Sequence, residues 1–297
     1  MSLAGIIWGT IGPGVQLAHD ASGLAPLTIS AYRAVVAVAV LVVASLVTGR
    51  LRSCWSLARH QWRRVIIVGV LTAAFQMLFF VAVVATGVSV ATVVCLGFAP
   101  VLLLFVSGAQ RRRLPSGGHS LTVLIAVVGL LLVSLVGGGS DHPASPVLGT
   151  LAALGSGAAY GLSAEVAAPL TRRLDTLTVT TATMSVAAVI VVPGGLVTAY
   201  LRGQPLTTAD PATWLLVVYL GVVTMAIAYA LLFTGLRTTP SGSAVVATLL
   251  EPVTAVLIAV AFLDEYLTVA GVVGSLLILT AIASLGRDSE EPQPQPQ

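Results

Sequence analysis

Glu251 and Pro252 lie next to each other in SGSAVVATLLEPVTAVLIAVAFLDE (241–265), a run that is otherwise apolar enough to span a membrane. A carboxylate inside such a run is costly in hydrocarbon and is expected to face the protein interior, a partner or water. Pro252 has no N–H and clashes with the preceding turn, so the carbonyl of Thr248 is expected to become a free acceptor. The chemistry that fits is the binding of a proton or a substrate ammonium in one state and its release in another.

Glu251 also has a structural interpretation, as an acid hydrogen-bonded to helix ends or permanently paired with Arg33, which lies in another apolar run. Arg33 could in turn stabilise a packing interface or an outer gate, or bind a substrate anion. Glu165 lies closer to the end of its run, where its carboxylate could extend into water. At about 1.5 Å per residue, Glu251 lies roughly 16 Å along its helix, Arg33 roughly 12 Å from the outer face and Glu165 roughly 10 Å from the inner face.

Polar and aromatic side chains inside the other apolar runs are candidates for lining a cavity, although each one also fits a packing role with a single hydrogen bond. They are Trp8, Tyr32, Gln76, Tyr160 and Tyr229. Pro100 and Pro252 either only kink their helices or act as a pair of hinges.

Several kinds of site are missing from the sequence. There is no cluster of His, Cys and acidic residues with metal-ligand spacing, no Gly-rich phosphate loop and no Ser/His/Asp set confined to one membrane face. No metal, cofactor or enzyme activity is therefore expected. Cys54 lies in an Arg-rich segment and Cys95 in an apolar run, which argues against a disulfide.

The composition is that of an integral membrane protein. Hydrophobic residues make up 57% and charged residues 8% of the 297 residues, and the mean hydropathy is +1.02. An ordinary soluble domain contains about 25% charged residues. The 14 basic residues are all arginine, and no soluble face on which they could alternate with exposed aromatics is expected. The net charge of +3 therefore points to membrane orientation rather than to nucleic-acid binding.

Ten apolar runs of about 17 to 25 residues are candidates for helices that cross the membrane. Their approximate ranges are 2–18, 25–48, 64–84, 87–107, 119–137, 146–170, 176–200, 213–235, 240–262 and 267–286. If all ten cross, twelve arginines fall on one side and Arg202 alone on the other, so the positive-inside rule places both termini in the cytoplasm and the protein in the cell (inner) membrane. The stretch RLRSCWSLARHQWRR (50–64) is expected to lie along the inner surface, with Trp55 and Trp62 at headgroup level.

The chain also aligns with itself at an offset of 152 residues. Shared Leu, Val and Ala content can align apolar helices by chance, but here the matches include less common residues. They pair Gly5 with Gly157, Gly9 with Gly161, Trp62 with Trp214, Gly69 with Gly221 and Pro100 with Pro252. Each half holds five helices, and an odd number means that the halves cross the membrane in opposite directions.

The predicted fold is therefore an all-α integral membrane protein with ten transmembrane helices arranged as two inverted five-helix repeats. Residues 1–137 form the first repeat and residues 138–286 the second. Residues 287–297 form a polar, proline-rich and disordered cytoplasmic tail.

One family shares this pattern. The second half contains LLEPVTAVLIAVAFLDEYLT (249–268) followed by GVVGSLLIL, with the pair Glu251-Pro252, an acidic turn at Asp264-Glu265 and glycines at 271 and 274. Together with the two repeats and Arg33, this pattern resembles the EamA-type transporters of the drug/metabolite transporter superfamily over nearly the whole chain except the tail. The first half departs from it, because Ala99 precedes Pro100 where the second half has an acid. The resemblance implies a ten-helix fold with a central cavity and the export of amino acids or related metabolites.

Two functions remain open at this point. The first is a secondary transporter that exports small metabolites, such as amino acids or related amphipathic compounds, by alternating access around a midplane cavity. Export follows from the resemblance alone. The second is a non-transporting membrane scaffold or lipid-handling protein, in which the buried charges are structural. The expected partners are a small-molecule substrate, the lipid bilayer and, if Glu251 titrates, protons; a monomer is compatible with either function.

Overall fold

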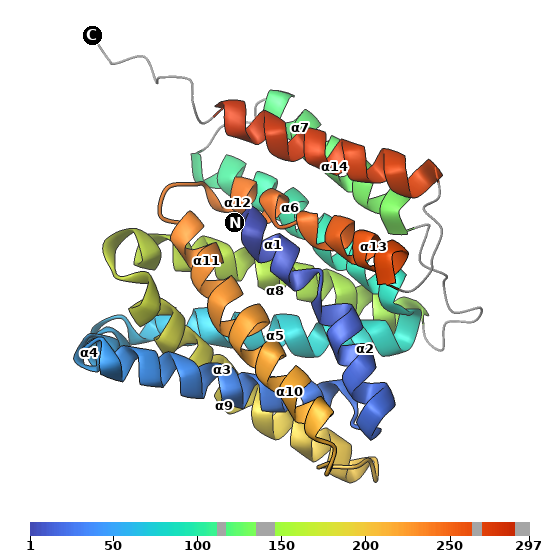
Figure 1. Ribbon diagram of the computed structural model, residues 1–297. Helices are drawn as coiled ribbons and strands as arrows, with labels where there is room; N and C mark the ends of the chain where they lie inside the picture. Colours follow the sequence, from blue (N-terminus) through green and yellow to red (C-terminus); the bar gives the residue numbers. More distant parts are fainter. Residues whose placement is uncertain (112–116, 135–145, 263–268, 289–297) are drawn as a thin grey trace.

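The computed structural model describes residues 1–111, 117–134, 146–262 and 269–288, and all regular structure in these ranges is helical (Figure 1). Each predicted apolar range falls on helix within them. Seven ranges contain one uninterrupted helix each: α3 (Pro26–Val47), α5 (Trp62–Thr86), α6 (Val88–Arg111), α7 (Gly117–Ser134), α8 (Pro146–Arg173), α9 (Thr176–Leu201) and α14 (Val269–Asp288). The acidic turn at 264–265 and most of the tail lie outside the described residues.

Three of the predicted helices are interrupted. The first is divided into α1 (Ser2–Trp8) and α2 (Ile11–Ser22). The eighth consists of α10 (Pro211–Tyr219), the π-helical segment η1 (Leu220–Ile227) and α11 (Ala228–Gly235). The ninth is divided into α12 (Ser241–Ala247) and α13 (Leu250–Phe262).

The break between α12 and α13 corrects one prediction, because the carbonyl of Thr248 is not a free acceptor. The backbone N–H of Glu251 donates to it at 2.9 Å. The N–H groups of Thr248 and Leu249 likewise donate to carbonyls three residues back, so the chain tightens into a short turn before Pro252. The turn thus satisfies the carbonyl that a proline would leave unpaired in a continuous helix.

Six helices of the described residues are long and apolar enough to cross a membrane: 26–47, 62–86, 90–109, 147–173, 176–201 and 211–235. The ranges 120–132 and 269–284 are shorter apolar helices. The interior contains many alanine, serine and threonine side chains, whereas large aliphatic side chains such as Val189, Leu215 and Leu276 are exposed. Small residues inside and large apolar residues outside are expected where lipid covers the outer surface. The chain is therefore a multi-pass membrane protein.

Helices that are far apart in the sequence pack against each other. The principal pairs are α5 with α8, α3 with α9, α7 with α14, and α6 with α8. In Figure 1, α7 and α14 lie side by side at one edge of the molecule, while α3 and α9 lie toward the opposite edge. Helix α1 lies between α11 and α13 and contacts both.

Glycines allow α1 to pack closely against the break in the ninth helix. A methyl group on Gly5 would lie 2.8 Å from the carbonyl oxygen of Thr248. One on Gly9 would lie 2.7 Å from the carbonyl oxygen of Glu251 and 2.6 Å from Cβ of Thr254. The backbone at Gly5 and Gly9 therefore lies directly against the backbone of Thr248 and Glu251.

This contact predicts a difference between two glycine substitutions. Gly9→Ala should lower the free energy of unfolding by about 2 kcal/mol, because its methyl group would overlap backbone and a β-branched side chain. Gly12→Ala is the matched control: nothing lies within 4 Å of a methyl group there, so this variant should be neutral or more stable by up to about 1 kcal/mol. Thermal unfolding of the two purified proteins in detergent measures the difference. Equal stability would mean that the close contact of α1 does not hold.

Two other glycine contacts resemble each other. A methyl group on Gly69 of α5 would lie 2.9 Å from the carbonyl oxygen of Thr183 and 2.5 Å from Cβ of Val186, both on α9. A methyl group on Gly221 of η1 would lie 2.8 Å from the carbonyl oxygen of Arg33 and 2.6 Å from Cβ of Val36, both on α3. In each case a glycine meets a carbonyl and a valine spaced three residues apart.

The predicted surface segment contains a separate helix, α4 (Leu51–His60). Cys54 and Leu57 are buried, whereas Trp55 is 75% exposed and Trp62, at the start of α5, is 52% exposed. The guanidinium carbon of Arg63 lies 5.4 Å from the centroid of the Trp62 ring. An amphipathic helix with exposed tryptophans suits the membrane–water interface.

Two helices begin at an aspartate whose carboxylate caps the first turn. Asp175 accepts from the N–H of Thr178 at 3.2 Å at the start of α9. Asp210 accepts from the hydroxyl and the N–H of Thr213 at the start of α10, at 2.6 and 2.8 Å. These bonds lower the pKa of the Asp210 carboxyl, because they favour its charged form. The sequence D-x-x-T therefore marks the N-terminus of both α9 and α10.

Candidate functional site

Six of the eight predicted polar site residues lie together in the interior, on six different helical segments. We call these the interior cluster: Trp8 of α1, Arg33 of α3, Gln76 of α5, Tyr160 of α8, Tyr229 of α11 and Glu251 of α13. Ring contacts, a hydrogen bond and charge interactions connect its members. The cluster thus joins segments from both ends of the chain.

Aromatic rings form one part of the interior cluster. The Trp8 ring is in edge-to-face contact with Tyr229, at a centroid distance of 5.3 Å, and with Tyr160, at 6.1 Å. Phe75 of α5 lies 5.2 Å from Tyr160. Rings in edge-to-face contact are rigid apolar surfaces that can bind the apolar part of a small molecule.

The Trp8 indole is anchored by an irregular helix. Its Nε1 donates to the carbonyl oxygen of Thr224 at 2.8 Å, and Thr224 lies in η1. A π-helical segment displaces the regular backbone hydrogen bonds, and such segments are frequent at functional sites. The Thr224 carbonyl in this segment therefore accepts a hydrogen bond from the side chain of Trp8, which lies near the other end of the chain.

Arg33 is buried and only partly hydrogen-bonded. It is 7% exposed, and its Nη2 donates to Oε1 of Gln76 at 3.1 Å. Gln76 is oriented in turn by donating its Nε2 to the carbonyl of Thr72. The Nε and Nη1 donors of Arg33 are buried and have no hydrogen-bond partner among the residues that the structure describes. Buried charged donors are costly unless they are paired, so these two donors of Arg33 are available to the acceptor of a ligand.

Glu251 is partly exposed and has no permanent cationic partner in the described part of the chain. Arg33 and Glu251 interact electrostatically, but they do not form an ion pair. The ion pair found among the described residues joins Arg50 and Asp175 at the surface. No hydrogen bond to the Glu251 carboxylate forms among the described residues either. The structure thus lacks the direct pairing with Arg33 that was one interpretation of Glu251.

The two tyrosines of the interior cluster differ in their hydroxyl contacts. The Tyr160 hydroxyl and Oγ1 of Thr248 are hydrogen-bonded at 2.8 Å, which connects α8 to the break before α13. The Tyr229 hydroxyl lies close enough to Arg33 and Glu251 to interact electrostatically with both, and no hydrogen bond to it forms within the described ranges. Tyr160 therefore supports the cluster, whereas the Tyr229 hydroxyl remains available to a ligand.

Two predicted residues lie outside the interior cluster. Tyr32 donates its hydroxyl to the carbonyl of Leu206 at 2.6 Å, and its ring meets Trp214 at 5.0 Å, near the segment that joins α9 to α10. Glu165 accepts a hydrogen bond from the hydroxyl of Ser241 at the start of α12. Both residues have a local partner, which explains their polarity without a ligand.

The two predicted hinge prolines occupy different local settings. Pro100 lies inside the uninterrupted helix α6. Pro252 lies in the first turn of α13, just after the break, where no helical hydrogen bond is lost. Their sequence positions match at the repeat offset, but only the second proline adjoins a helix break.

Phe75 and Thr248 belong to the surroundings of the cluster and were not identified as site residues from the sequence. Phe75 adjoins Gln76, but its own residue type is common in apolar runs and does not distinguish it from a lipid-facing residue. Thr248 was singled out for its carbonyl, whereas its hydroxyl makes the contact to Tyr160. The described residues contain no group of three or more His, Cys, Asp or Glu side chains that could hold a metal ion, and both cysteines are buried and free.

Comparison with known proteins gives three findings. Residues 1–135 and 147–287 each match the EamA-like transporter family. The chain is 26% identical over 280 residues to the "Uncharacterized transporter YwfM" of Bacillus subtilis (strain 168), covering 94% of this chain and 90% of that protein. A solved structure, titled "Crystal structure of protein", shares the fold with a TM-score of 0.77 at 20% identity, covering 97% of this chain and 96% of the other.

Proposed function

Because the chain belongs to the EamA-like transporter family, we propose that it is a secondary transporter that exports small amphipathic metabolites, such as amino acids or related compounds. In this proposal, transport proceeds by alternating access around the interior cluster, and the residue count along its helix places Glu251 near the middle of the membrane. The observation that carries this proposal is that, within the described residues, buried Arg33 has two donors without a partner and Glu251, with which it interacts electrostatically, has no ion-pair partner.

A zwitterion fits the charges of the interior cluster. Its carboxylate would accept from Nε or Nη1 of Arg33, the two donors that have no partner among the described residues. Its ammonium would lie against Glu251, and its apolar part against the rings of Trp8, Tyr160 and Tyr229. A proton on Glu251 could replace the ammonium when the site is empty, and this would couple transport to pH.

The proposed architecture is ten membrane crossings in two inverted repeats, residues 1–137 and 138–286. Two observations support it. The family matches twice, once in each half. The contact of Gly69 with Thr183 and Val186 has the same form as the contact of Gly221 with Arg33 and Val36. The glycines are 152 residues apart and their partners 150, so the second half contains two more residues between these contacts.

The proposed orientation places both termini in the cytoplasm of a cell whose inner membrane holds the protein. In a variant without Cys54 and Cys95, single cysteines at the exposed positions 61, 204 and 238 report on it. An impermeant thiol reagent added to intact cells should label Gln204→Cys and leave Gln61→Cys and Thr238→Cys unlabelled until the cells are opened. Labelling of position 61 or 238 from outside would overturn both the orientation and the number of crossings.

The proposed hinges are Pro100 and Pro252. Pro100→Ala and Pro252→Ala should slow the maximal rate of transport several-fold while leaving the substrate KM within a few-fold, because stiffer halves exchange states more slowly. The effect should be larger at Pro252, which adjoins the break between α12 and α13. Rates measured in liposomes decide the matter, and unchanged turnover in both variants would reduce the prolines to packing residues.

A screen of labelled compounds tests the proposed function. Purified protein in liposomes should exchange at least one amino acid or related metabolite across the membrane. A protein that folds and inserts but exchanges none of a broad panel would instead fit a membrane scaffold or lipid-handling protein.

A further inference from the structure

A pocket of about 650 Å³ opens between α4 and the start of α5 on one side and the junction of α8 and α9 on the other. Its ionisable lining residues are Arg50, Arg52, His60, Arg64, Arg173 and Asp175. Leu57 and Leu170, which are 4% and 2% exposed, contribute apolar atoms to the lining. The lining of the pocket therefore combines mostly basic charged side chains with buried apolar side chains.

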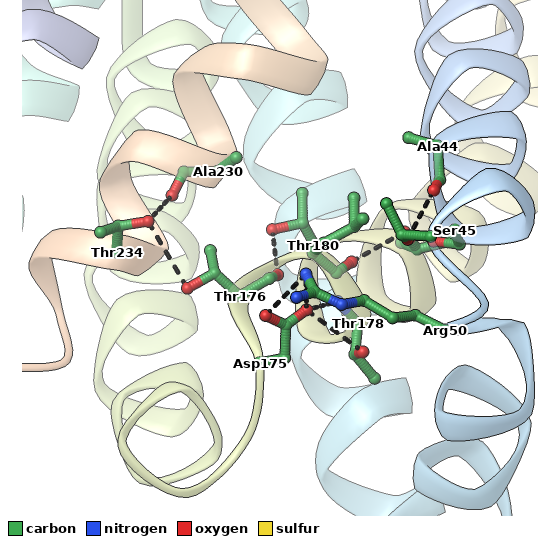
Figure 2. Close-up of polar contacts among 12 residues, drawn as sticks. Ala44, Ser45, Arg50, Asp175, Thr176, Thr178, Thr180, Ala230 and Thr234 are labelled. Carbon is green, nitrogen blue, oxygen red and sulfur yellow. Dashed lines mark hydrogen bonds and ion pairs between the residues drawn. The ribbon is translucent and has the colours of Figure 1, made fainter.

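Only one of the four guanidinium groups is neutralised within the described residues. Arg50 pairs with Asp175 at 2.9 Å, and Asp175 is held in place by the N–H of Thr178 (Figure 2). Arg52, Arg64 and Arg173 have no ion-pair or hydrogen-bond partner within the described ranges. Three positive charges from two separate parts of the chain thus converge on one pocket.

The surroundings of the pocket indicate its depth in the membrane. Exposed Trp55 and Trp62 flank the basic residues on α4 and α5, and tryptophan prefers the headgroup level of a bilayer. A basic pocket between helices at this depth has the chemistry to bind an anionic lipid headgroup. A free anion would use the arginines but leave the apolar lining and the flanking tryptophans without a role.

We propose that this pocket binds the negatively charged headgroup of an anionic phospholipid from the cytoplasmic leaflet, and that the bound headgroup bridges α4 and α5 to α8 and α9. The cytoplasmic assignment rests on the orientation proposed above, whereas binding of the headgroup does not. The positive-inside rule by itself requires arginines on this side but not in one pocket. Arg59 and Arg63 make this distinction testable, because they belong to the same basic segment and do not line the pocket.

The test measures the affinity of the purified full-length protein in detergent for short-chain phosphatidylglycerol, by its stabilisation against thermal unfolding. Arg52→Gln/Arg173→Gln should weaken binding about 30-fold, since each arginine near an anionic lipid contributes about fivefold. Arg59→Gln/Arg63→Gln removes the same charge from exposed positions and should change the affinity less than threefold. Short-chain phosphatidylcholine should bind at least tenfold more weakly than phosphatidylglycerol to the unaltered protein.

Three results would overturn the proposal. Equal losses in the two double variants would mean a diffuse charge effect rather than a site. Phosphatidylcholine that binds as tightly as phosphatidylglycerol would exclude recognition of the anion. Glycerol phosphate that binds as tightly as the lipid, with the same dependence on Arg52 and Arg173, would make a soluble phosphate the ligand.

If the double variant does not fold, the single variants Arg52→Gln and Arg173→Gln replace it. Each should weaken lipid binding about fivefold, and no loss in either would contradict the site.

Discussion

Glu251→Gln is expected to reduce transport about 100-fold while the protein keeps its fold and thermal stability. The loss corresponds to about 3 kcal/mol, which is typical for removing one member of a desolvated charge pair that forms with a ligand. Stability should persist because Glu251 has no ion-pair partner among the described residues. When the carboxylate becomes an amide, Arg33 loses an electrostatic interaction but no hydrogen-bonded ion-pair partner.

Glu165→Gln is the matched control for this experiment. Glu165 is also an acid inside an apolar helix, but it bonds to Ser241 and lies outside the interior cluster. Transport should stay within a few-fold of the unaltered protein. Transport and thermal stability should be measured on the same preparations, at several pH values. A Glu251→Gln protein that is destabilised along with its activity would make Glu251 a structural acid, and one with unchanged transport and pH dependence would make it a solvated bystander.

Arg33→Met is expected to abolish measurable transport and at the same time to stabilise the protein. Two guanidinium donors are buried and have no partner in the described part of the chain, so the native protein carries a desolvation cost that methionine removes. Replacing buried charged groups by apolar side chains of similar volume often stabilises a protein by about 1 to 4 kcal/mol. Gln76 loses one hydrogen bond but keeps its bond to the Thr72 carbonyl. The melting temperature should therefore rise by several degrees.

Arg237→Met provides the comparison for Arg33→Met, because Arg237 is exposed and lies outside the interior cluster. Its melting temperature and its transport should both stay close to those of the unaltered protein. A fall in the melting temperature of Arg33→Met would show that Arg33 holds helices together. In that case its two unpaired donors would not be a site for a substrate carboxylate.

The sequence predicted the helices and the six residues of the interior cluster for the same physical reason. Apolar runs define the helices, and polar side chains within them must turn inward because lipid cannot solvate them. Trp8, Arg33, Gln76, Tyr160, Tyr229 and Glu251 follow this rule and meet in space. Tyr32 and Glu165 do not join the interior cluster. Each has a hydrogen-bond partner elsewhere, the Leu206 carbonyl for Tyr32 and the Ser241 hydroxyl for Glu165.

The irregularities of the helices could not be predicted from local sequence. The segment LGVVTMAI (220–227) contains Gly221 and Thr224. Gly69 and Thr72 have the same spacing in the regular helix α5, so these residue types do not distinguish a π-helix from an α-helix. The Trp8 indole that bonds to its Thr224 carbonyl comes from more than 200 residues away in the chain. Pro252 was expected to leave the carbonyl of Thr248 free, but the break before Glu251 was not expected, and its turn uses that carbonyl. The arginine positions suggested an orientation, yet their spacing gave no sign of the pocket between α4 and α9.

The central claim is that the interior cluster binds a substrate during transport, and counterflow in liposomes tests it most directly. Liposomes loaded with an unlabelled candidate metabolite and placed in a trace of the labelled compound should accumulate the label transiently when they contain the unaltered protein. Liposomes with Glu251→Gln should accumulate about 100-fold less, whereas those with Glu165→Gln should match the unaltered protein. Accumulation that is equal in all three preparations would contradict the claim, because transport would then proceed without the interior cluster.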